Sequence, residues 1–70
     1  MHPEYLPTTT DGKLTHVMEE SAEVIKLICK SQRFGIDSVH PVHGYVTRTK
    51  LLAEMDDLRQ AIKALERALT

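Results

Sequence analysis

The apolar residues of the chain fall into two helical patterns, separated by a connection that contains glycine, proline and histidine. From residue 13 to about Arg33 they recur at the intervals that place side chains on one face of an α-helix. They are Leu14, Val17, Met18, Val24, Ile25 and Ile28. Gly35 is expected to end this helix. Residues 1–12, which include two prolines and three consecutive threonines, are expected to be an extended lead-in, and Asp11 is a candidate helix cap.

The second pattern predicts another helix, which Thr47 or Thr49 can open. Its apolar positions alternate four and three residues apart, as in helices that pack at a shallow angle. They are Leu51, Met55, Leu58, Ile62, Leu65 and Leu69. The expected fold is therefore all-α, with residues 13–70 forming one antiparallel helical hairpin. Because one hairpin leaves half of each apolar seam exposed, we expect a homodimer or homotetramer of the four-helix-bundle type.

Composition narrows the classes of protein that the chain can represent. A chain of 70 residues with one Phe, two Tyr and no Trp can bury only a modest core, which also favours an oligomer. Cys29 has no partner for a disulfide and is expected to pack as an ordinary helix residue. Nine Lys and Arg against ten Asp and Glu leave no basic excess for a nucleic acid polymer. Without a membrane-length apolar run or a signal-peptide pattern, we expect a cytoplasmic protein without a membrane partner.

Acidic residues lie beside the apolar stripe of both expected helices. In "EESAE", Glu20 and Glu23 lie about 60° apart on a helical wheel, and Glu54 and Asp57 in "EMDD" have the same spacing. An antiparallel hairpin can bring these four carboxylates together, where they repel one another unless a cation neutralises them. Oxygen ligands favour Mg²⁺ or Mn²⁺. Glu19 lies further round the first helix, toward solvent.

A plainer interpretation of these acids stays open. Glu19 or Glu23 can form ordinary ion pairs with Lys26 or Lys30, one turn or two turns along a solvated helix face. Lys30 and Lys50 lie near the acidic positions and can meet phosphate oxygens as point charges, or can serve as surface lysines.

The sequence from Leu14 to Ile62 resembles the short, phage-type members of the MazG-like all-α nucleoside triphosphate pyrophosphohydrolases. "EESAE" and "EMDD" match the EExxE and ExxD signatures of that family. The resemblance implies a magnesium-dependent hydrolysis between the α- and β-phosphates of a nucleoside triphosphate. It also implies four metal ligands, which are Glu20, Glu23, Glu54 and Asp57. Glu19 would be a further ligand or would orient or deprotonate the attacking water.

The chain departs from the family pattern at two points. Asp56 stands where the family often has glycine. Longer members add helices that help to enclose the nucleotide, so catalysis by this chain would depend on a partner subunit or be lost. Two other functions therefore remain open, a non-catalytic helical interaction module and a nucleotide-binding regulator that retains the metal site.

The remaining candidate chemistry lies in histidines and aromatic rings. In "HPVH", His40 and His43 straddle a proline, so loop packing or contact with a nucleotide is favoured over a zinc site. His16, one turn before Glu20, is expected to face solvent, with a role in sensing the acidic cluster as the alternative. If a nucleobase stacks on this protein, the available rings are Tyr5, Phe34 and Tyr45.

Overall fold

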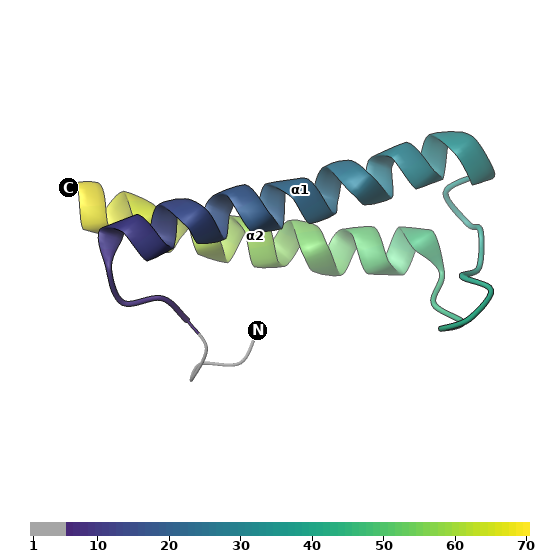
Figure 1. Cartoon of the computed structure of the whole chain (residues 1–70). Coiled ribbons are helices and arrows are strands. Elements are labelled where there is room, and N and C mark those ends of the chain that lie inside the picture. The colour runs from purple at the N-terminus through teal and green to yellow at the C-terminus, as the bar shows by residue number, and fades with distance from the viewer. Residues whose placement is uncertain (1–5) are drawn as a thin grey trace.

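The computed structural model describes residues 6–70, which form an antiparallel hairpin of two α-helices (Figure 1). Helix α1 spans Thr10–Phe34 and helix α2 spans Thr47–Leu69. The two helices pack along each other, and no strand occurs in the described part of the chain, so the expected all-helical hairpin is confirmed. Within residues 6–70 no helix is long and apolar enough to cross a membrane. The part of the expected lead-in at residues 1–5, with Tyr5, lies outside the described residues.

Local capping explains where α1 begins and ends. The Thr9 side chain accepts a hydrogen bond of 3.0 Å from the backbone N–H of Gly12, so Thr9 is the cap and Asp11 lies in the first turn. The helix therefore starts at Thr10, earlier than the expected boundary at residue 13. At the other end, Gly35 has a φ of 97° and donates its N–H to the Ser31 carbonyl. Gly35 ends the helix as predicted.

Residues 35–46 form an ordered connection that is held against the start of α2. Val39 and Val46 pair as an isolated antiparallel bridge, and Gly44 turns the chain between them with a φ of 73°. Thr47 is 4% exposed, and its hydroxyl lies 2.7 Å from the Ser38 hydroxyl. The Thr47 hydroxyl also donates to the Ser38 carbonyl at 3.1 Å, which leaves the Ser38 hydroxyl to donate to Thr47. These hydrogen bonds fix the first turn of α2, which begins at Thr47, one of the two predicted starts.

The contact between the helices is small. Val24 and Leu27 of α1 and Ala61 of α2 are the buried apolar residues of residues 6–70, and Ala61 is 2% exposed. Its small side chain suits a close approach of the two helices. Cys29 is exposed, so the expectation that it packs is wrong. The reason is geometric, since Cys29 lies two residues beyond Leu27 and therefore on the outer side of α1.

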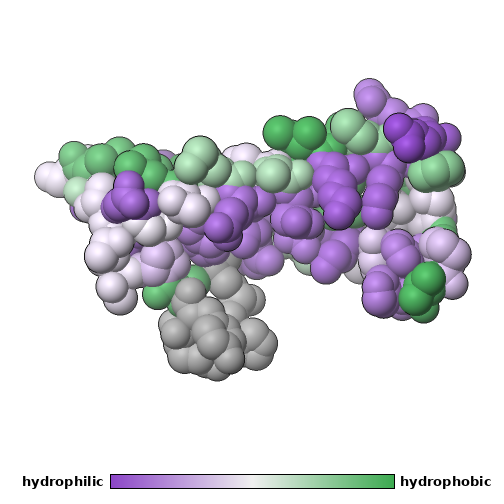
Figure 2. All heavy atoms as spheres, viewed as in Figure 1, coloured by the Kyte–Doolittle hydropathy of each residue, from purple (hydrophilic) through white to green (hydrophobic). Residues whose placement is uncertain are grey.

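The hairpin has an apolar face on one side. Its members are large apolar residues that remain between 37% and 64% exposed: Leu14, Met18, Ile25 and Ile28 on α1, with Met55, Ile62 and Leu69 on α2. At 100° per residue, those of α1 lie on one side of Val24 and Glu20 lies on the other. Figure 2 shows apolar atoms along its upper edge, over α1 and over the C-terminal end of α2, and a largely hydrophilic face toward the viewer. Part of each seam is therefore exposed, as expected for a single hairpin.

Candidate metal centre

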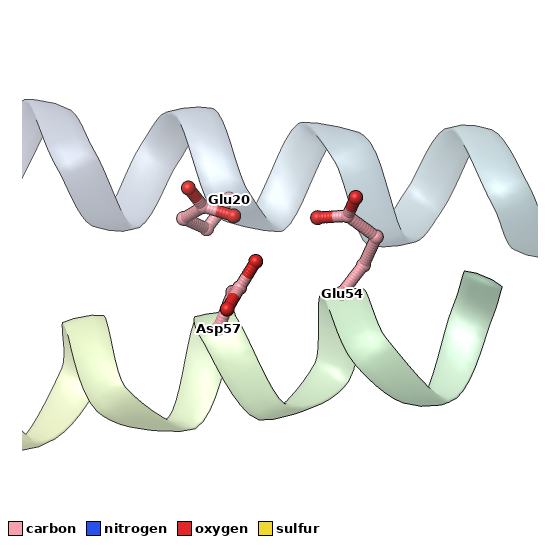
Figure 3. A group of neighbouring side chains, drawn as sticks. All are labelled: Glu20, Glu54 and Asp57. Carbon is pink, nitrogen blue, oxygen red and sulfur yellow. The ribbon is translucent and has the colours of Figure 1, made fainter. Parts of the chain in front are cut away.

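Three carboxylates from the two helices meet in the middle of the hairpin. Glu20 projects from α1, and Glu54 and Asp57 project from α2, into the space between the helices (Figure 3). One ligand oxygen of each residue lies within 4.8 Å of those of the other two, and all three residues are half-buried. Glu54 and Asp57 are three residues apart, so they occupy one edge of α2. We refer to these three residues as the carboxylate group.

A histidine and a lysine border the carboxylate group. His16 Nε2 lies 3.2 Å from Glu20 Oε1, and Lys50 Nζ lies 3.0 Å from Glu54 Oε1. The hydrogen bond and charge of Glu54, together with Tyr45 and Glu23, raise the pKa of Lys50. Asp57 forms no ion pair with any other residue of 6–70. The group therefore retains uncompensated negative charge, most directly at Asp57.

The donor set fits a hard divalent cation. All three donors are oxygens, which Mg²⁺ and Mn²⁺ prefer. Two oxygens bound to one Mg²⁺ lie at most about 4.2 Å apart, twice the usual Mg–O distance. The ligand oxygens lie within 4.8 Å of one another, so a shift of at most about 0.6 Å would bring them within that limit. Three protein ligands would leave octahedral positions for water or phosphate oxygens.

The other predicted acids lie outside the carboxylate group. Glu23 and Glu19 are both exposed, and Glu23 lies near enough to Lys50 to affect its pKa. Within residues 6–70, neither residue forms the alternative ion pair with Lys26 or Lys30. The proposed roles of Glu19 and Glu23 remain predictions. His16 was expected to face solvent, but its side chain is 16% exposed because it packs against Glu20.

A pocket of about 510 Å³ lies at the loop end of the hairpin. Lys30, predicted to contact phosphate, is half-buried and lines this loop pocket. The other lining residues come from the end of α1, the connection and the start of α2: Phe34, Ser38, Val39, His40, Pro41, Tyr45 and Thr47. Most of these side chains are apolar or aromatic, as in small-molecule sites. The pocket brings together rings that the sequence presented only as separate candidates.

The turn that follows His40 fixes the tautomer of its neutral ring. Its Nδ1 accepts hydrogen bonds from the backbone N–H groups of Val42 and His43, at 3.1 and 3.0 Å. Partial burial, followed by the charges of His43 and Lys30, lowers the pKa of His40. The neutral ring therefore carries its proton on Nε2, an assignment that follows from the hydrogen bonds. These two hydrogen bonds show that His40 packs within the connection.

A second cavity of about 290 Å³ lies on the other side of the carboxylate group along α2. Three polar side chains of α2 line part of it: Gln60, Lys63 and Arg67. These residues were not identified as candidates from the sequence. His16, the partner of Glu20, also lines this cavity. The spacing of the α2 residues in the sequence does indicate that they are neighbours on the helix surface, because Gln60 follows Asp57 by three residues and Lys63 and Arg67 lie four apart.

Comparisons with protein-family models, with curated proteins and with solved structures found no match to this chain.

Proposed function

We propose that the protein is a Mg²⁺-dependent nucleoside triphosphate pyrophosphohydrolase of the MazG-like type. The observation that carries this proposal is the carboxylate group, in which acids of the two signature-like segments converge from separate helices. The fit of "EESAE" and "EMDD" to the family signatures supports the substrate class. The reaction would add the oxygen of water to the α-phosphorus and release pyrophosphate, leaving a nucleoside monophosphate.

Glu20, Glu54 and Asp57 would hold the ion, with Glu23 as the fourth predicted ligand. Mg²⁺ supplies Lewis acidity toward phosphate oxygens and lowers the pKa of water that it binds. Lys50 Nζ lies 3.0 Å from Glu54 Oε1, so Lys50 would offer its ammonium to a phosphate bound near the ion. Lys30 offers a second positive charge at the loop pocket. These lysines would position the triphosphate and offset its charge.

We infer that two or more hairpins assemble through the apolar face. The chain exposes 5232 Å², whereas a monomeric protein of 7.9 kDa exposes about 4,400 Å². The seven exposed residues of the apolar face offer roughly 600 Å² per hairpin, and a paired face would bury more than about 1,000 Å² in total. Pairing two such faces gives a four-helix assembly whose carboxylate groups lie on the outer sides.

The same apolar face favours a second candidate, a non-catalytic helical interaction module. In that case association through the apolar face is the function, and the carboxylates are solvated charge. Turnover separates the two candidates. We expect hydrolysis of at least one triphosphate in a panel of nucleoside triphosphates with Mg²⁺, and loss of that activity in Glu20→Gln and Glu54→Gln.

Asp56→Asn is the matched control, because Asp56 is exposed and bonds to Gln60 outside the carboxylate group. Equal activity in the two Glu variants and the wild type would reject the assigned ligands. Binding of nucleotide with Mg²⁺ but without turnover would leave a regulator. Association without metal or nucleotide binding would leave the interaction module.

A further inference from the structure

We propose that the loop pocket holds the nucleoside part of the substrate, a planar heterocycle with its sugar, while the phosphates extend along α2 to the carboxylate group. This inference rests on the proposed function and adds the location and direction of the nucleotide. The carboxylate group and the loop pocket belong to the same hairpin, so one chain would provide both contacts.

The lining of the loop pocket suits a flat, partly polar ring. Its volume of about 510 Å³ lies within the range of small-molecule sites, about 300 to 1,000 Å³. The rings of Tyr45 and His40 lie 4.7 Å apart between centroids, and the Phe34 ring also lines the pocket. Aromatic faces stack on nucleobases of any sequence because every base has a π-face.

His40 adds a directional contact. Since its Nδ1 already accepts from two backbone N–H groups, its Nε2–H is the ring donor left for a ligand. A heterocycle that presents a carbonyl oxygen or a ring nitrogen can accept this hydrogen bond. The Ser38 and Thr47 hydroxyls also line the pocket but bond to each other, so they form a fixed polar wall.

Lys50 connects the loop pocket to the carboxylate group. Its ammonium lies 5.8 Å from the centroid of the Tyr45 ring and 3.0 Å from Glu54 Oε1. Thr47 in the pocket and Glu54 are seven residues apart on α2, a rise of about 10 Å. An extended nucleotide spans this distance, so a base beside Tyr45 would leave its phosphates next to Lys50.

The test measures binding of the four common nucleoside 5′-monophosphates to the full chain in EDTA, so that metal and catalysis do not contribute. The readouts are the dissociation constant and the NMR shifts of the His40 and Tyr45 ring protons. We expect ring-current shifts at both rings, and roughly 10-fold weaker binding in Tyr45→Leu. Val42→Ala is the control, because Val42 lies in the same connection, is 80% exposed and does not line the pocket.

Lys50→Gln gives a second variant that leaves the residues of the connection unchanged, and it should weaken the monophosphate more than the uncharged nucleoside. Unchanged ring shifts, or wild-type affinity in both variants, would overturn the proposal. Binding at these rings without triphosphate hydrolysis would reject the enzyme and keep the pocket. Hydrolysis with an unchanged KM in Tyr45→Leu would reject the pocket and keep the enzyme. If the wild type neither binds nor hydrolyses nucleotides, both are rejected.

Discussion

Replacing Asp57 by Asn should stabilise the metal-free protein. Asp57 shares the carboxylate group with Glu20 and Glu54, whose oxygens lie within 4.8 Å. At that separation two like charges repel by about 1 kcal/mol in water and about 3.5 kcal/mol at an effective dielectric constant of about 20. Lys50 offsets part of the charge of Glu54. We therefore expect a net gain of about 1 kcal/mol, which raises the Tm of a domain this size by about 4 to 8 °C.

The assay is thermal unfolding followed by circular dichroism, first in EDTA and then with increasing Mg²⁺. A cation that binds only the folded state must raise the wild-type Tm, and it should raise that of Asp57→Asn much less. Asp56→Asn makes the same charge change at an exposed position and should stay within about 0.5 kcal/mol of the wild type. A destabilised Asp57→Asn in EDTA, or an equal Mg²⁺ response in the two proteins, would refute this reasoning.

Three further predictions address the connection and the apolar face. Thr47→Val should lower the free energy of unfolding by about 1 to 2 kcal/mol in urea titrations, because the Ser38 hydroxyl loses its partner. No change would show that the hydrogen bonds between Thr47 and Ser38 are not stabilising. The pKa of His40 is lower in the folded protein than in the unfolded chain. The stability that the neutral His40 ring contributes is therefore present above about pH 6.5 and is lost as the pH falls through the pKa of the folded state. Amide protection at the two N–H groups bonded to His40 should fall in acid in the wild type but not in His40→Gln, and a flat wild-type profile would contradict this. Ile25→Glu should lower the sedimentation coefficient to that of the monomer. Leu52→Glu, at a position that is 60% exposed and outside the apolar face, should leave it unchanged. Equal effects of the two substitutions would exclude the apolar face as the interface.

The two helices could be predicted because their signals are local. Apolar spacing defines the helical segments, and Gly35 provides the backbone conformation that ends α1. The start of α1 was placed too late because both Thr9 and Asp11 can cap a helix. Only the geometry shows that the Thr9 hydroxyl accepts from Gly12.

The carboxylate group could be predicted only in part. A helical wheel places Glu20 and Glu23 near the same edge, but which of them reaches the other helix depends on the direction of the helix contact. Val24, Leu27 and Ala61 set that direction, and it favours Glu20. The spacing of apolar residues does not identify which residues of α2 are buried, because Ala61 and Thr47 are buried while the larger Met55 and Ile62 are not.

The loop pocket was beyond sequence reasoning for a different reason. Its rings come from a connection without periodicity, and their positions depend on the bridge between Val39 and Val46 and on the turn at Gly44. The sequence identifies Tyr45 and His40 as candidates but contains no local signal that places them against Lys30.

The most direct test uses Mn²⁺ as a paramagnetic probe in an NMR titration of the ¹⁵N-labelled protein. If carboxylates of both helices share one ion, substoichiometric Mn²⁺ should broaden the backbone amides around Glu20 on α1 and around Glu54 and Asp57 on α2 together, and excess Mg²⁺ should reverse the effect. Broadening confined to one helix, or spread evenly over all exposed acids, would contradict a shared divalent cation site.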